Sequence, residues 1–255
     1  MVSDVMMERM TSPRVKEAVA AGADTALIML GATEQHGPHL PLASDALIAE
    51  WVGTRIAARL GQTLMAPVIR PGCSDHHMAF SGTISLRSET LKAILHDYCA
   101  SLVEHGFKKI IIITIHGGNM KPMIEVAPEL ARTFDGVEIH VMTEAEPMLA
   151  SVWAVSKKHG VDPLAAGAHA GEAESSMLLA GAPELTEMDR AERGLVAEMS
   201  EWSEKAHAEG LQSVTPNGVL GDPAGSNAGA GLDYLDALAM HHVNQYRQGR
   251  MLIKP

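Results

Sequence analysis

The chain has 255 residues, 46% of them hydrophobic, with a formal net charge of −11 and a sequence pI of about 5.6. This length allows one full core or two small ones, and the acidic balance argues against a sequence-independent grip on nucleic acid. The two cysteines, Cys73 and Cys99, exclude a disulfide framework. Residues 1–10 lack a continuous apolar core, and no run of about 18 apolar residues occurs. We therefore expect a cytoplasmic globular protein without a signal peptide or a membrane span.

Short apolar runs alternate with helical patterns through the first 145 residues. Buried strands are predicted at 25–30, 63–69, 109–115 and 136–142. Helices are predicted at 46–60, 88–106 with Ser88 as its N-cap, 119–134 with interruptions at its prolines, 144–160, 172–180, 190–209 and 233–248. The alternation indicates an α/β fold, with a mostly parallel sheet and helices on both of its faces. No change of composition marks a linker, so a single domain over residues 1–255 is expected.

Residues able to bind metals follow two of these strands. Glu34 and His36 come after the strand at 25–30, and His116 comes after the strand at 109–115. Ligands of open α/β sheets bind beyond the carboxyl ends of the strands, so both segments are expected to face one crevice. Glu34 and His36 are two residues apart, which puts their side chains on one face of an extended segment.

Two further segments add carboxylates to this set. Asp45 lies where a helix begins, and the helix dipole favours its ionised form, which can bridge two cations. His169, Glu172 and Glu174 precede or begin the helical run that ends at Gly181. A mixed set of imidazole and carboxylate ligands suits Zn, Mn or Fe.

Plainer explanations exist for each of these residues taken singly. Histidines are often hydrogen-bonded at the edge of a core, and glutamates are mostly solvated. Gly117 and Gly118 fit a tight strand-to-helix turn on backbone grounds alone. The same turn could instead cradle a phosphate at a helix N-terminus, which keeps a non-catalytic metal-binding or phosphate-binding protein open. The case for a metal site therefore rests on the joint pattern.

Four segments together resemble the creatininase (creatinine amidohydrolase) family in order and spacing. They are TEQHGPHLPLASD (33–45), HHMAFSGTISL (76–86), HGGN (116–119) and HAGEAESS (169–176), within a match that covers roughly residues 25–185. The resemblance implies a layered α/β sandwich with a parallel sheet, a homohexamer and two divalent metal ions per chain.

The resemblance also assigns ligands. It implies that Glu34 and His116 hold one metal, that His36 holds the other and that Asp45 bridges both. Creatininase takes its remaining ligand from a glutamate at the place of Gly118, which cannot ligate. Most other relatives use the glutamate that corresponds to Glu172, so Glu172 is expected to complete the second site. Glu174 is then expected in a supporting role.

The resemblance implies that His169 is the general acid/base. We expect His77, Trp153, Gly117 and Gly118 to contact the substrate, and segments 143–168 and 210–231 to form the pocket walls. Ala165 stands where creatininase has a tryptophan, and His76 replaces a glutamate, which argues against creatinine as the substrate.

A dinuclear metal-dependent amidohydrolase is the leading interpretation. Two metals can lower the pKa of a shared water towards about 7 and polarise an amide carbonyl, while His169 protonates the departing amine. The expected substrate is a small molecule with a non-peptide C–N bond, most simply a cyclic amide. The alternatives are a short-peptide peptidase, a deformylase of the same family, or the non-catalytic binding protein described above.

Overall fold

The computed structural model describes residues 5–254, and its centre is a four-stranded sheet in the order β2-β1-β3-β4. All three pairs of neighbouring strands are parallel. The strands are β1 (Thr25–Leu30), β2 (Thr63–Met65), β3 (Lys109–Thr114) and β4 (Glu138–Val141). Every residue of β1 is buried, as are the last five of β3, because helices cover both faces of the sheet. The predicted α/β fold with a parallel sheet is confirmed.

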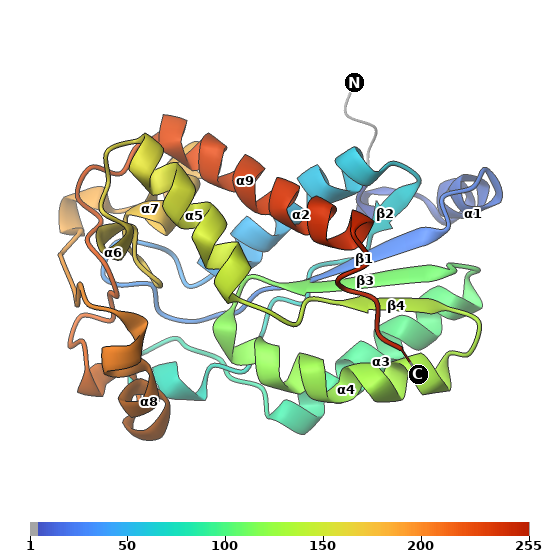
Figure 1. The fold of residues 1–255 in the computed structure, drawn as a ribbon, viewed down its shortest axis with the longest axis horizontal. Helices are drawn as coiled ribbons and strands as arrows, with labels where there is room; N and C mark the ends of the chain where they lie inside the picture. The colour runs from blue at the N-terminus through green and yellow to red at the C-terminus, as the bar shows by residue number, and fades with distance from the viewer. Residues whose placement is uncertain (1–4, 255) are drawn as a thin grey trace.

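Helices lie on both faces of the sheet (Figure 1). They are α1 (Ser12–Ala20), α2 (Ser44–Leu60), α3 (Ser88–Glu104), α4 (Met120–Thr133), α5 (Glu146–Lys158), α6 (Pro163–Ala166), α7 (Glu172–Gly181), α8 (Met199–Glu209) and α9 (Ala228–Arg247). In the view of Figure 1, α2, α5 and α9 lie above the sheet, whereas α3 and α4 lie below it. None of the helices within residues 5–254 is long and apolar enough to cross a membrane.

Several predicted boundaries differ from the observed ones. The strand predicted at 63–69 ends at Met65, because Pro67 has no N–H to continue the ladder. Ser88 is the first residue of α3 and Arg87 is its N-cap. The prolines do not interrupt α4, and α9 begins at Ala228, five residues before the predicted start at 233. The short helices α1 and α6 were not predicted. Residues 1–4, part of the segment predicted to lack a signal peptide, lie outside the described residues.

The predicted helix at 190–209 is wrong in its first half. The N–H of Gly194 donates to the carbonyl of Gly221, and the N–H of Leu195 donates to the carbonyl of Val219. This extended pairing replaces helical hydrogen bonds, and only Met199–Glu209 forms α8. A Cβ atom at position 194 would collide with the backbone of Val219, so glycine permits the close approach.

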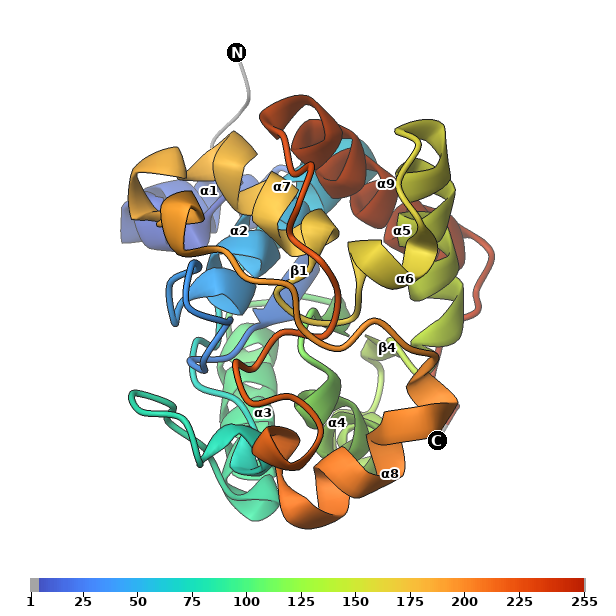
Figure 2. The same cartoon turned by 90° about the vertical axis from the view of Figure 1, so that its left-hand side faces the viewer.

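The carboxyl ends of the strands face a crowded end of the molecule. Figure 2 looks onto this end, where α6, α7 and α8 lie around the loops that follow β1 and β3. Here α8 packs on a small apolar cluster of Ala206, Leu211 and Leu220, which is separate from the main core. The loops that carry the predicted metal ligands therefore meet beneath helices from the second half of the chain.

Candidate metal centre

The predicted ligands of the first metal lie together at the end of the sheet. Glu34 is in the loop after β1, and His116 follows β3, the neighbouring strand. The Nδ1 atom of His116 is 3.2 Å from Oε1 of Glu34 and 3.4 Å from Oδ2 of Asp45, the second residue of α2. All three residues are buried, and their ligand atoms lie within 4.8 Å of one another. Parallel pairing of β1 and β3 thus joins segments about 80 residues apart in the sequence.

A second group forms on the other side of Asp45. The Nε2 atom of His36 is 3.2 Å from Oδ1 of Asp45 and 3.7 Å from Oε2 of Glu174. One oxygen of Asp45 therefore faces His116 and the other faces His36. This is the arrangement in which a carboxylate can be shared between two cations.

Backbone carbonyls orient both imidazole rings. His36 Nδ1 is 3.1 Å from the carbonyl oxygen of Glu34, and His116 Nε2 is 2.9 Å from that of Cys73. We assign the proton to the nitrogen that faces the carbonyl in each ring, because only an N–H can donate there. The other nitrogen, which faces the carboxylates, is then the one that would give its lone pair to a metal ion in exchange for a proton.

Glu174, and not the expected Glu172, lies at the second group. Glu172 is fully buried, and its two oxygens accept hydrogen bonds of 2.6 Å from Ser176 Oγ and Tyr234 Oη. Because successive residues of an α-helix turn by about 100°, side chains two positions apart point to opposite sides. In α7 this directs Glu172 towards α9 and Glu174 towards His36. The expectation that Glu172 completes the second site does not fit this geometry.

The backbone before α7 supports Glu174. Ala170 has a φ of 53°, a left-handed conformation uncommon for residues other than glycine. Its N–H donates a 2.6 Å hydrogen bond to Oε2 of Glu174. The turn thus holds the carboxylate in place beside His36.

The chemistry of the cluster fits bound cations. Within residues 5–254, both oxygens of Glu34 and Oδ2 of Asp45 are buried without a hydrogen-bond partner. The contacts of His116 to these oxygens are short but lack hydrogen-bond geometry. Buried acceptors without a donor are costly, and a cation would satisfy them.

The electrostatics of the cluster point the same way. Burial opposes a charged His36 ring, but Asp45 and Glu174 outweigh it and raise the pKa of His36 to about 10. Burial also opposes ionisation of Glu34, but the charge of His116 prevails and lowers the pKa of Glu34 to about 2. The carboxylates therefore hold positive charge firmly at this place, as a site for divalent cations must.

Gln35, which sequence reasoning did not single out, connects two histidines beside the cluster. Its side-chain oxygen accepts from the N–H of Gly37 at 2.9 Å, and its side-chain nitrogen donates to the carbonyl of Gly218 at 3.1 Å and to Nδ1 of His77 at 3.0 Å. Its backbone carbonyl accepts a 2.7 Å hydrogen bond from Nε2 of His169. The one signal in the sequence was the position of Gln35 between two candidate ligands.

This network fixes which ring nitrogens face the cluster. With Nε2 protonated, His169 presents Nδ1 to Glu34, 3.8 Å from Oε1. With Nδ1 accepting from Gln35, the protonated Nε2 of His77 lies 3.3 Å from the same oxygen but without hydrogen-bond geometry. Burial lowers the pKa of His169 to about 3, with a smaller contribution from charged His36. Burial likewise lowers the pKa of His77 to about 2, so both rings are neutral.

A cavity of about 160 Å³ opens beside the cluster and is lined by six residues of the expected site. Its walls include Glu34 and His116 of the cluster, together with His77, Gly117, Gly118 and His169. A Cβ atom at position 118 would collide with the backbone of Cys73 and crowd His116, so this glycine allows the close approach of the two loops.

The outer wall of this cavity was not predicted. It comes from α8, through Met199, Trp202, Ala206 and His207. Trp153, which was expected to contact the substrate, lines a neighbouring pocket and does not line this one. Of the two predicted wall segments, 143–168 contributes Ala168 and 210–231 contributes Leu211 and Leu220.

Comparisons with known proteins agree with the geometry. Residues 8–245 match the family model described as creatininase, creatinine amidohydrolase. A mycofactocin precursor peptide peptidase of Mycobacterium ulcerans is 37% identical over 210 residues, which cover 79% of this chain and 76% of that protein. A creatinine amidohydrolase of Pseudomonas putida is 27% identical over 203 residues, which cover 74% of this chain and 76% of that protein.

Solved structures of creatininase share the fold. A variant described as the Zn–Zn type has a TM-score of 0.80 at 22% identity and covers 97% of this chain and 98% of its own. A manganese form has a TM-score of 0.79 at 22% identity, with 97% and 99% covered. At this identity the structural similarity shows only that the fold is shared. The family model and the peptidase relative show that the chain belongs to the family. The chain is a member of the creatininase family of metal-dependent amidohydrolases.

Proposed function

We propose that this enzyme is a peptidase that cleaves a short peptide, and that the cyclic amide placed first by the sequence is not its substrate. The observation that carries the proposal is the 37% identity to a mycofactocin precursor peptide peptidase over 79% of the chain. The residues agree, since Gly118 and Ala165 stand where creatininase has a ligand and a substrate-packing tryptophan. Family membership also removes the non-catalytic binding protein from consideration.

Five residues would hold two divalent metal ions per chain, Zn or Mn. Glu34 and His116 face one side of Asp45, and His36 and Glu174 face the other. Bound there, the ions would supply a water of lowered pKa and polarise an amide carbonyl. The mixed set of nitrogen and oxygen donors suits both metals.

His169 is positioned to move the proton that the reaction requires. Its Nε2–H is anchored on the carbonyl of Gln35, and its free Nδ1 faces the cluster. The neutral ring can accept a proton on Nδ1 and pass it to the departing amine, which is a poor leaving group until it is protonated. We expect His169→Ala to keep both metals and to lower kcat on the order of 10²–10⁴-fold. A loss of metal from this variant would instead make His169 a ligand.

The test is a comparison of substrate classes on one preparation. The protein, loaded with Zn or Mn, is offered short unblocked peptides, creatinine and a formamide, and products are followed by mass spectrometry. We expect peptide cleavage that is absent from Asp45→Ala. Turnover of creatinine or the formamide without any cleavage of peptides would contradict the proposal.

Three expectations from the sequence stay predictions. The resemblance implies a homohexamer, which sedimentation velocity can check. A cytoplasmic location and a single folding unit over residues 1–255 can be checked by fractionation of cells and by limited proteolysis.

A further inference from the structure

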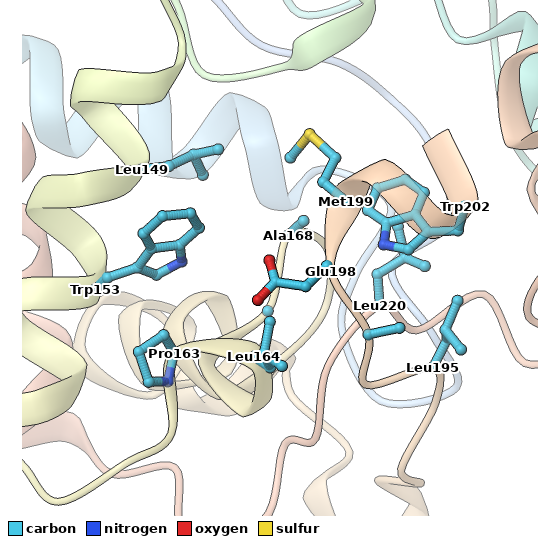
Figure 3. Close-up of a pocket in the computed structure, with 12 residues that line it drawn as sticks. Leu149, Trp153, Pro163, Leu164, Ala168, Leu195, Glu198, Met199, Trp202 and Leu220 are labelled. Carbon is cyan, nitrogen blue, oxygen red and sulfur yellow. The ribbon is translucent and has the colours of Figure 1, made fainter. Parts of the chain in front are cut away.

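A second pocket lies next to the cavity of the metal centre. Trp153 of α5 and Trp202 of α8 stand on opposite sides of it, and the Glu198 carboxylate points into the space between them (Figure 3). Both tryptophans are half-buried. We call this space the Glu198 pocket.

The lining of the Glu198 pocket has one charge. Twelve residues line it, and Glu198 is the only ionisable residue among them. The rest of the wall is apolar and includes Leu149, Leu164, Leu195 and Leu220. The Glu198 carboxylate attracts a cation by direct charge, and a cation that reaches an indole face gains a cation–π contribution as well. An anionic group would be repelled.

The Glu198 pocket continues from the cavity of the metal centre. Four residues line both spaces: Ala168, Met199, Trp202 and Leu220. Ala168 directly precedes His169 in the chain. A substrate whose reacting carbonyl lies at the cluster therefore has a neighbouring group at the entrance to the Glu198 pocket.

The size of the pocket limits its occupant. Its volume is about 40 Å³, room for roughly three water-sized groups. An unbranched chain with a compact tip fits this space better than an aromatic ring. Long cationic side chains have this form, with an apolar stem and a charged end.

We propose that the Glu198 pocket binds a lysine-like side chain of the peptide substrate, next to the bond that is cleaved. This inference rests on the proposed peptidase function. The stem packs on the leucines, and the charged tip lies between Trp153 and Trp202 against the Glu198 carboxylate. The net charge of −11 favours the approach of such a peptide.

Binding can be tested apart from catalysis. The metal-free full chain is titrated with Ala-Ala-Lys-Ala-Ala and with the same peptide carrying norleucine, a neutral residue of similar length, and tryptophan fluorescence reports the Kd. We expect the lysine peptide to bind on the order of tenfold more tightly, as a hydrogen bond to a charged group allows. Glu198→Gln should abolish most of this preference.

A matched control separates the pocket from helix stability. Glu198 is the N-cap of α8 and forms a capping box with Glu201. Glutamine at position 198 keeps a side-chain oxygen for the cap and removes only the charge. Glu201→Gln removes a charge from the same turn, but Glu201 does not line the pocket, so the preference should stay.

The metal-loaded enzyme gives a second readout, the ratio of kcat/KM for the lysine peptide to that for the norleucine peptide. We expect a ratio of about ten or more, which falls towards one in Glu198→Gln and is kept in Glu201→Gln. A preference for lysine that survives Glu198→Gln in both assays, or no preference at all, overturns the proposal. Tight lysine-dependent binding without cleavage of any peptide would support the pocket and contradict the peptidase.

Discussion

At the scale of single residues, the buried Glu172 and the partly buried Glu174 show how two carboxylates in one helix turn take different roles. Tyr234 and Ser176 occupy both oxygens of Glu172, whereas Glu174 has an oxygen 3.7 Å from His36. Burial raises the pKa of Glu174 to about 7, with His36 opposing it, so a cation is needed to favour the ionised form fully. The first carboxylate holds α7 against α9, and the second is free to ligate.

This difference predicts opposite effects of two matched substitutions. Glu174→Gln should lower the metal content to about one ion per chain with a small change in unfolding free energy, because the negatively charged ligand is replaced by a neutral amide. Glu172→Gln should keep both ions and lower the unfolding free energy by roughly 1–3 kcal/mol. The amide nitrogen of glutamine cannot accept one of the two hydrogen bonds that the carboxylate accepts. Elemental analysis after dialysis and urea unfolding measure the two quantities. Loss of a metal from Glu172→Gln alone would restore the assignment expected from the sequence.

The sequence could supply these two residues but could not choose between them. Which of them faces the cluster depends on where α7 begins and on how it is rotated, and a shift of one residue turns each side chain by about 100°. Both the left-handed Ala170 and the contact to Tyr234 on α9, 62 residues away, set that rotation. Neither is visible as a local pattern.

At the scale of elements, α7 and α9 pack so closely that one glycine determines their separation. A Cβ atom at Gly231 of α9 would collide with the carbonyl of Ser176 in α7 and lie 2.9 Å from Cβ of Ala180. Backbone cannot move aside as a side chain can. The contact therefore positions the helix that carries Glu174.

We expect Gly231→Ala to lower the unfolding free energy by roughly 1–3 kcal/mol, the usual cost of overpacking. Gly229→Ala is the matched control in the same helix, since its Cβ would meet only the Asn227 side-chain oxygen at 3.3 Å. The control should be neutral or stabilising by up to about 1 kcal/mol, because alanine favours helix more than glycine. Urea unfolding measures the free energy of unfolding of both variants. Equal values would show that α9 moves away from α7 without an energetic cost.

At the scale of the whole molecule, the central architecture was readable from the sequence and the pocket was not. The apolar runs at 25–30 and 109–115 predicted β1 and β3 almost to the residue, and the positions after them predicted where Glu34 and His116 would meet. A strand that is buried on both faces is a continuous apolar run in the sequence, so the ends of the run mark the ends of the strand.

The placement of α8 depends on contacts that no local pattern encodes. Residues 190–198 look helical, yet Gly194 and Leu195 pair with Gly221 and Val219. The segment leads into α8, which carries Trp202 to the cavity beside the metal centre. The apolar cluster that holds α8 joins Ala206 to Leu220, across a loop. The outer wall of the cavity was therefore hidden from sequence reasoning, whereas the cluster of ligands was not.

The metal centre joins four parts of the chain, and this predicts a coupling between metal binding and stability. Its five proposed ligands come from the loop after β1, the start of α2, the loop after β3 and the start of α7. A ligand that binds only the folded state stabilises it by about 2.7 kcal/mol at a free concentration one hundred times its Kd. We therefore expect Zn or Mn to raise the Tm of the metal-free protein by several degrees, and a chelator to reverse the change.

Asp45→Asn should lose most of this response, because Asp45 faces both groups of ligands. Asp236→Asn, which changes an exposed carboxylate paired with Arg55 and Arg59, should keep it. Differential scanning fluorimetry over a series of metal concentrations measures the shift. A full response in Asp45→Asn would show that the metals bind elsewhere.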